Sequence, residues 1–300
     1  MIKEPIKPLL RSPVRLKPLE ERGNFFFAPG EEIYPIIDGI ICMLLPEERA
    51  RDLGDKKFYD KNPFGQRNWQ NNIDIKFGVE RDLDLILEKL SKTDLIIDVG
   101  SGTGRISIYL DRAGYHNVVS LDFSYFSLLQ VRQNSSNVCI WGNNLHLPFA
   151  SNSFDFVISS GVIHHTPEPL TALKECVRIL KPGGTLYLKT YNLWSPYCLL
   201  YFTYGSIMRF FERSELTQKI SDLLGFSIYK FIRRFIYRLP KREDRILRAQ
   251  FNNLFMKSMV SFLTKESIEI VLDKCHIVVE RYKTSSPTHR MHCYVGIKKS

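Results

Sequence analysis

The fold is decided by Leu95-Ile-Ile-Asp-Val-Gly-Ser-Gly-Thr-Gly104, a short apolar run that ends in three glycines. The apolar run is typical of a buried strand, and glycines directly after a strand let the backbone pass close to a ligand. Residues 106–113 predict a helix whose first N–H groups face the same place. A dinucleotide fingerprint needs glycine at position 105, where Arg105 stands. The turn therefore favours a nucleotide-like ligand with little phosphate, the alternative being a tight turn without a ligand.

The residues on both sides of this turn predict alternating strands and helices. Strands are expected at 95–99, 118–122, 138–141, 154–159 and 185–189, helices at about 124–132 and 170–180, and a closing antiparallel pair at 277–282 and 291–297. Strands separated by helices form βαβ units, which place helices on both faces of a parallel sheet. The predicted fold class is α/β, a doubly wound, seven-stranded Rossmann-like sheet.

Composition excludes several classes of protein. The chain has 300 residues, of which 44% are hydrophobic, so a disordered chain is excluded. No apolar run has transmembrane character, the N-terminus lacks a secretory h-region, and none of the six cysteines forms a C-x-x-C pair. We expect a cytoplasmic protein without a metal site or a disulfide framework.

The net charge of +10 is confined to one region. Residues 196–300 hold 19 basic and 9 acidic side chains, whereas residues 1–195 are almost neutral. A uniformly basic surface is therefore excluded, and a local feature of the C-terminal third must explain the excess.

Asp122 strengthens the case for a nucleoside ligand. It ends the second strand, 22 residues after Gly100, where a carboxylate can accept hydrogen bonds from both hydroxyls of a ribose. The alternative is that Asp122 only caps the helix that begins near Ser124.

Four motifs in order now carry a family resemblance. They are Asp98-Val-Gly-Ser-Gly-Thr-Gly, Leu121-Asp-Phe-Ser, Asn144-Leu-His-Leu-Pro-Phe with Phe154-Asp-Phe, and Leu180-Lys-Pro-Gly-Gly. Over about residues 94–190 the chain resembles the class I S-adenosylmethionine-dependent methyltransferases, in particular the methyltransferase type 11 group that includes the ubiquinone/menaquinone C-methyltransferases. The resemblance implies S-adenosyl-L-methionine as cofactor.

The resemblance also implies the residues that hold the methionine and ribose parts of this cofactor. Gly100, Ser101 and Gly102 would line the methionine moiety, and Asp98 would face its ammonium group. Asp122 would bind the ribose.

The adenine and the sulfonium are assigned in the same way. Phe123 would lie against adenine, and Asn143 and Asn144 would hydrogen-bond it. Asn143 stands where the family usually has an acid, so we expect weaker binding there, although an amide oxygen still accepts from an amine. Ser160, at the end of the fourth strand, would lie beneath the sulfonium.

His164 and His165 are the candidate catalytic residues. Methyl transfer is an in-line displacement in which the protein mainly orients the nucleophile and excludes water. A histidine near the acceptor could take or steer its proton. The alternative is that both residues only support the loop or line the pocket.

The sequence pattern divides the residues before the methyltransferase domain into a β-rich segment and a linker. Asp38-Gly39 predicts a hairpin, and Tyr34–Glu48 resembles the end of a Trm112-like domain. Because no cysteine pair precedes Cys42, residues 1–50 are interpreted as a degenerate, metal-free, β-rich module. Residues 51–75 would be a linker and 76–300 the methyltransferase domain, beginning with an amphipathic helix at 76–90.

A helical, lid-like insertion at about 195–262 follows the fifth strand. Within it, residues 224–239 predict a helix with an apolar stripe and a basic side. The stripe is Ile228, Ile232, Phe235, Ile236 and Leu239, and the basic residues are Lys230, Arg233, Arg234 and Arg238. Three interpretations stay open, namely a lid packed on the catalytic domain, contact with an anionic membrane surface, and contact with RNA.

The sequence thus predicts methyl transfer to a small acceptor, lipophilic or aromatic because of the aromatic insertion. A cytoplasmic enzyme, with peripheral contact at the inner face of the membrane as an option, fits this prediction. The alternatives are an RNA methyltransferase, for which no RNA-binding motif is visible, and a non-catalytic cofactor-binding or membrane adaptor.

Overall fold

The computed structural model describes residues 5–28, 30, 33–50, 83, 86–211, 224–236, 247, 251, 255, 260–285 and 290–299. The expected linker at 51–75 lies outside the described residues. So do most of the expected helix at 76–90, of which the turn η2 (Leu87–Lys89) is described, and parts of the insertion, including Arg238 and Leu239.

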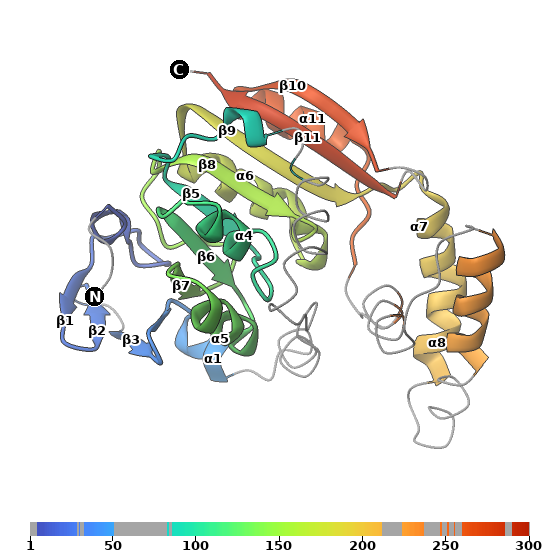
Figure 1. Ribbon diagram of the computed structural model, residues 1–300, viewed down its shortest axis with the longest axis horizontal. Helices are drawn as coiled ribbons and strands as arrows, with labels where there is room; N and C mark the ends of the chain where they lie inside the picture. The colour runs from blue at the N-terminus through green and yellow to red at the C-terminus, as the bar shows by residue number, and fades with distance from the viewer. Residues whose placement is uncertain are drawn as a thin grey trace.

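The predicted α/β sheet is confirmed. Its seven strands are β5 (Ile96–Val99), β6 (Val118–Asp122), β7 (Val138–Trp141), β8 (Phe154–Ser160), β9 (Leu180–Tyr191), β10 (Ile277–Thr284) and β11 (Met291–Lys298). They lie in the order β7-β6-β5-β8-β9-β11-β10, parallel from β7 to β9, with β11 antiparallel to both of its neighbours (Figure 1). Strand order reverses between β5 and β8, which is the switch point where open α/β sheets bind ligands.

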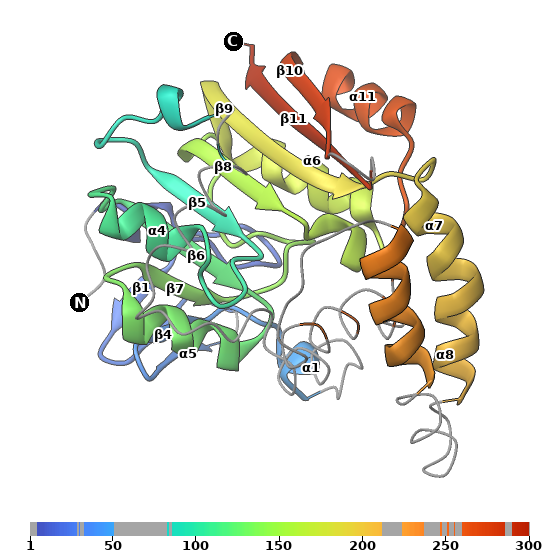
Figure 2. The same cartoon turned by 45° about the vertical axis from the view of Figure 1, so that its right-hand side comes forward.

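Helices cover both faces of this sheet (Figure 2). On one face α4 (Ser107–Arg112) and α5 (Tyr125–Asn134) bury Leu110 and Leu128. On the other face α6 (Pro169–Ile179) and α11 (Lys265–Lys274) bury Leu173 and Leu272. The central strands are therefore apolar on both sides, which explains why each reads as a continuous hydrophobic run.

The N-terminal strands continue the sheet at its β7 edge. After the turn η1 (Lys7–Leu9), β1 (Glu20–Arg22), β2 (Phe25–Phe27), β3 (Ile33–Ile37) and β4 (Ile40–Cys42) form an antiparallel meander, and α1 (Pro46–Ala50) follows. The predicted turn at Asp38-Gly39 joins β3 to β4, with φ of 51° and 75° at its two residues. Strand β4 then pairs in parallel with β7. The Trm112-like interpretation of residues 1–50 stays a prediction, but their strands belong to one eleven-stranded sheet over the described residues.

The insertion begins as a helix directly after β9. Elements α7 (Pro196–Leu200), η4 (Tyr201–Gly205) and α8 (Ser206–Phe211) follow one another without a break, beside a second helix formed by residues 224–231 and η5 (Ile232–Ile236) (Figures 1 and 2). The two helices approach closely at Gly225, where a Cβ would stand 2.3 Å from the sulfur of Met208.

The second helix buries a different face from the one that the lid interpretation requires. Phe226 and Tyr229 are buried, whereas Ile228 and Phe235 of the predicted stripe are 45% and 62% exposed. The close approach at Gly225 brings this side of the helix against Met208, which shares one buried cluster with Phe226 and Tyr229. Ile228 and Phe235 thus face solvent instead of packing on the catalytic domain.

The parallel pairing of β4 makes a prediction about stability. Ile41, 1% exposed and paired with Ile140, lies in the core of the catalytic domain. We expect Ile41→Ala to lower the free energy of unfolding by about 2–4 kcal/mol, because the deletion leaves a cavity. Ile37→Ala, at a β3 position that is 40% exposed, should cost less than about 1 kcal/mol. Urea unfolding of both variants measures the difference, and equal losses would show that β4 is not part of this core.

Candidate cofactor site

The glycine turn after β5 is held against the neighbouring strand β6. The N–H groups of Gly100 and Ser101 both donate to the carbonyl oxygen of Leu121, at 2.7 and 3.0 Å. These bonds fix the turn at the carboxyl edge of the sheet, beside Asp122.

Asp122 connects the turn to the helix that follows β6. Its Oδ2 accepts from the Gly102 N–H at 2.7 Å, and its Oδ1 accepts from the Ser124 N–H at 2.8 Å. Asp122 therefore has a structural role, although the N-cap of α5 is Ser124, whose side chain accepts from the Ser127 N–H. The ribose role stays a prediction that is compatible with this geometry, because each carboxylate oxygen can accept a second hydrogen bond.

Two glycines of the turn are required by close packing. A Cβ at Gly100, where φ is 75°, would lie 2.3 Å from a methyl carbon of Val162 in the loop after β8. A Cβ at Gly104, where φ is 86°, would lie 2.6 Å from Ile108 of α4. No larger residue fits either position without moving its neighbours. The backbone of the turn is therefore pressed between α4 and the β8 loop.

Asp98 is a buried carboxylate beneath this turn. It is 2% exposed, and its Oδ2 has no hydrogen-bond partner within the described residues. Burial, together with the charge of Asp122, raises the pKa of this carboxyl to about 7, against the lowering effects of Arg105 and of hydrogen bonds from Ser107. An unsatisfied buried acid is costly by itself, and a ligand cation such as an α-ammonium group would remove this cost. The residues present therefore fit the methionine end of S-adenosylmethionine.

The residues predicted to meet adenine follow β6 and β7. Phe123 is half-buried, and its carbonyl oxygen accepts from Nε1 of Trp141 at 3.0 Å. The side chain of Asn143 donates from Nδ2 to Oε1 of Glu48 at 2.6 Å, and its Oδ1 accepts from the Leu145 N–H at 2.9 Å. Asn144 is half-buried beside it. The sequence predicted this neighbourhood but missed Glu48, because nothing local connects α1 with β7.

The two histidines lie in the loop after Ser160, the half-buried last residue of β8. His164 is 1% exposed, stacks on Tyr191 at 3.8 Å between ring centroids, and accepts the Tyr191 N–H at its Nδ1 at 3.2 Å. In the neutral ring the proton is therefore on Nε2, and Nδ1 is already occupied as an acceptor. The half-buried His165 lies with its ring centroid 4.2 Å from that of His164. This geometry favours the loop-supporting alternative for His164.

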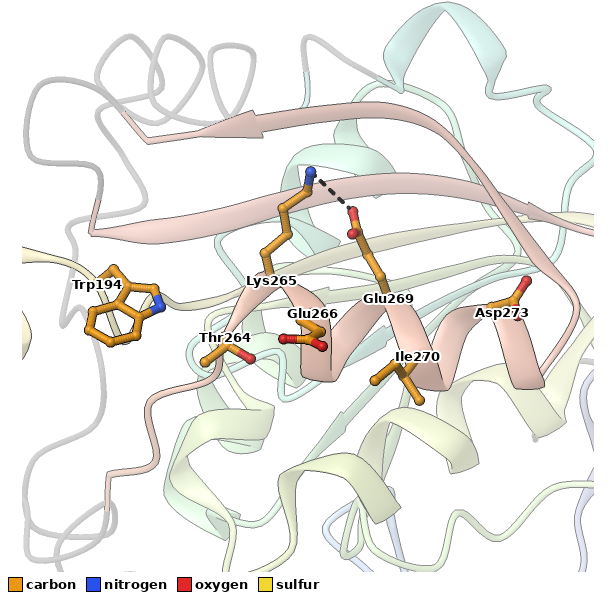
Figure 3. A pocket seen from close by; sticks show the side chains of 7 residues that line it. All are labelled: Trp194, Thr264, Lys265, Glu266, Glu269, Ile270 and Asp273. Carbon is orange, nitrogen blue, oxygen red and sulfur yellow. Dashed lines mark ion pairs between the residues drawn. The ribbon is translucent and has the colours of Figure 1, made fainter.

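An open pocket of about 630 Å³ lies elsewhere, along the outer side of α11 (Figure 3). Its lining residues are Trp194, Thr264, Lys265, Glu266, Glu269, Ile270 and Asp273. None of them is a residue that the sequence predicted for cofactor or acceptor. The cofactor site is thus defined by the strand ends and not by this pocket.

Comparisons with known proteins identify the family of the chain. A family model described as a methyltransferase domain matches residues 97–188. The ubiquinone/menaquinone biosynthesis C-methyltransferase UbiE of Roseobacter denitrificans is 35% identical over 181 residues, which cover 54% of this chain and 69% of that protein. The probable tRNA methyltransferase 9B of Homo sapiens is 35% identical over 105 residues, which cover 34% of this chain and 22% of that protein.

A solved structure shares the fold. Magnesium protoporphyrin IX methyltransferase (ChlM) from Synechocystis, with bound S-adenosylhomocysteine, has a TM-score of 0.50 at 15% identity and covers 83% of this chain and 100% of its own. The chain therefore belongs to the class I methyltransferases. It carries their S-adenosylmethionine-dependent domain, in the family that includes the quinone C-methyltransferase UbiE.

Because Asp98 is buried with a raised pKa, its replacement by asparagine should stabilise the fold but weaken cofactor binding. Because its pKa is raised from 3.8 to about 7 in the folded chain, the native state binds a proton that the unfolded state releases. Stability is then lost as the pH rises through this window, and the full cost is present above it. We expect Asp98→Asn to raise Tm at pH 8 by several degrees and to weaken S-adenosylhomocysteine binding at least about tenfold.

Calorimetric titrations and thermal unfolding at pH 6 and pH 8 measure both effects. The stability gain should shrink at pH 6, and wild-type affinity should fall there, since a neutral carboxyl no longer attracts the ammonium group. Unchanged affinity in Asp98→Asn would contradict the assignment.

Proposed function

We propose that this chain transfers the methyl group of S-adenosylmethionine to a small lipophilic or aromatic acceptor. The observation that carries the proposal is a group of rings at the carboxyl end of β9, called here the aromatic cluster. It consists of Tyr191, Tyr197, Tyr201, Phe255 and Phe262, with neighbouring centroids 4.9 to 6.3 Å apart. Such rings bind apolar and aromatic molecules by area and by edge-to-face contacts.

The aromatic cluster is continuous with the cofactor site through the loop after β8. Val162 touches the glycine turn at Gly100, and His164, two residues later, stacks on Tyr191. An acceptor bound on the cluster would therefore lie beside the methionine end of the cofactor. The name of the relative UbiE, a quinone C-methyltransferase, supports an acceptor of this chemical kind.

Charge near the aromatic cluster suggests what else the acceptor carries. The guanidinium of Arg290 lies 5.9 and 5.6 Å from the ring centroids of Tyr191 and Tyr197. Burial raises the pKa of Tyr197 well above its usual value, so this phenol stays neutral at physiological pH. Arg290 would then be available to attract an acidic hydroxyl or carboxylate of the acceptor.

The chain's own part in the reaction is orientation and exclusion of water. When bound, S-adenosylmethionine supplies an electrophilic methyl group. Asp98 would hold the methionine end of the cofactor and Asp122 its ribose, while Val162 and Tyr191 would line the space in which the acceptor meets the methyl group. His164 accepts the backbone N–H of Tyr191, which supports a positioning role for this side chain. In-line displacement gains most of its rate from such positioning.

The proposal predicts where a labelled methyl group goes. The protein is incubated with S-adenosylmethionine labelled in its methyl group and with a whole-cell extract, and lipids and RNA are then separated. Label should enter small molecules that partition into the organic phase. Tyr197→Ala should lower this transfer about tenfold or more, while Tyr282→Ala, on the outer strand β10, should leave it nearly unchanged.

Two results would contradict the proposal. Label in the RNA fraction would favour the alternative suggested by the basic insertion and by the relative named as a probable tRNA methyltransferase. Cofactor binding without any transfer would favour a non-catalytic adaptor.

We also propose that the insertion meets an anionic membrane surface, where a lipophilic acceptor would be found. Of the 17 large hydrophobic side chains that are exposed in the described part of the chain, nine lie between residues 194 and 235. On the second helix Leu224, Ile228, Phe231 and Phe235 repeat at helical spacing along one face and are 45–62% exposed. Among the described residues no helix has both the length and the apolar character needed to cross a bilayer. An exposed apolar stripe flanked by Arg233 and Arg234 is the pattern of a helix that lies in the interface.

Liposome flotation tests this contact. The protein should float with vesicles of equal parts phosphatidylcholine and phosphatidylglycerol, and less with phosphatidylcholine alone. Phe231→Ser with Phe235→Ser should abolish flotation, because the apolar anchor is lost, and Arg233→Glu with Arg234→Glu should weaken it. Phe126→Ser, at an equally exposed position of α5, is the matched control. Flotation that survives all of these changes would show that this helix is not the contact.

A further inference from the structure

Glu48 of α1 is a carboxylate that lies before residues 76–300 in the chain and has no role so far in the cofactor site. Strand β4 is parallel to β7, with Cys42 opposite Trp141, so the chain that leaves β4 emerges at the carboxyl edge of the sheet. The N–H of Met43 continues this ladder onto the carbonyl of Trp141 at 2.8 Å. Residues 45–50 are thereby delivered to the edge where the cofactor residues lie.

Glu48 is firmly held at this place. Its Oε2 accepts from the Leu45 N–H at 2.9 Å, which closes the first turn of α1, and its side chain is 12% exposed. Its Oε1 accepts from Nδ2 of Asn143 at 2.6 Å and lies 3.0 Å from Nε2 of His146. Burial acts to raise the pKa of Glu48, but the hydrogen bonds from His146, Asn143 and Leu45 outweigh it, so the pKa is lowered. Glu48 is thus a carboxylate at neutral pH.

The place of Asn143 in the sheet indicates which part of the ligand it meets. The strands run in the order β7-β6-β5, with the glycine turn and Asp98 on β5 and Asp122 on β6. A nucleoside whose amino-acid end lies at β5 and whose ribose lies at β6 extends its base over β7. Asn143 is the second residue after β7.

An amide side chain has one acceptor end and one donor end, and a hydrogen-bond network decides which way it points. In Asn143 the donor end is committed to Glu48, and the acceptor end to the Leu145 N–H, with a second lone pair on Oδ1 left for a ligand. We propose that Glu48 is a positioning residue that locks the amide of Asn143 as an acceptor, so that the site selects a 6-amino purine over a 6-oxo purine. The inference rests on the cofactor site described above.

The test compares two ligands that differ only at purine position 6. Calorimetry measures the Kd of S-adenosylhomocysteine and of its deaminated form, S-inosylhomocysteine. Wild type should prefer the amine about tenfold or more, because a carbonyl facing a fixed acceptor leaves both oxygens unpaired. Glu48→Gln should reduce the preference to about threefold or less, since a side-chain amide in place of the Glu48 carboxylate lets Asn143 turn over. Glu47→Gln, at the exposed neighbouring position, should retain the full preference.

An exchange of the two side chains separates positioning from mere stability. Glu48→Gln combined with Asn143→Asp keeps the hydrogen bond and the total charge, and it leaves position 143 as an acceptor. This double variant should recover the preference for the amine, whatever its Tm. If the wild type binds both ligands equally, or if Glu48→Gln keeps the full preference, the inference is wrong. If the wild type fails to bind S-adenosylhomocysteine, the cofactor site itself is wrong.

Discussion

Two backbone N–H groups share the carboxylate of Asp122, and the rest of the site depends on this bridge. One comes from the glycine turn after β5 and the other from the start of α5. Because hydrogen bonds to a carboxylate are stronger than those between neutral groups, the turn and the helix are held at one point of the sheet edge. The buried Asp98, the loop that carries Val162 and the residues after β7 are all arranged around this point. The residues of the site are thus held in place by contacts between several strand ends and not by any one strand.

The described part of the insertion has a buried aromatic inner side and an exposed apolar outer side. Its inner side contributes rings to the aromatic cluster, and Gly225 allows the two helices to approach closely at Met208. Its outer side leaves large apolar side chains in water, where each forgoes the stabilisation that burial would give. A patch of this kind on a folded chain marks a surface that is covered by a partner or a membrane. By sequence, residues 195–262 hold 12 basic and 5 acidic side chains, which is most of the basic excess of the C-terminal third and favours an anionic surface.

The central fold and much of the candidate site could be predicted from the sequence because their signals are local. Apolar runs such as Ile96–Val99 and the glycines after them are visible within ten residues, and strand ends converge once the strands are parallel. What could not be predicted depends on distant pairing. The parallel addition of β4 to β7, the burial of Ile6 and Leu10, and the contact of Glu48 with Asn143 have no local signature. The sequence also left open whether Ile228 and Phe235 face the catalytic domain or solvent, since periodicity shows that a stripe exists but not whether it is buried.

The pairing of β4 with β7 has a consequence for how the chain folds as it is synthesised. Residues 40–42 leave the ribosome long before residues 138–141, so β4 must wait for its permanent neighbour. During that time the antiparallel contacts from β1 to β4 can hold the segment together, because hairpins close quickly over short loops. The unpaired edge of β4 is the vulnerable surface in this interval, and it offers hydrogen bonds to any other extended chain. Slow synthesis or delayed folding of residues 118–141 would therefore favour aggregation through the N-terminal strands.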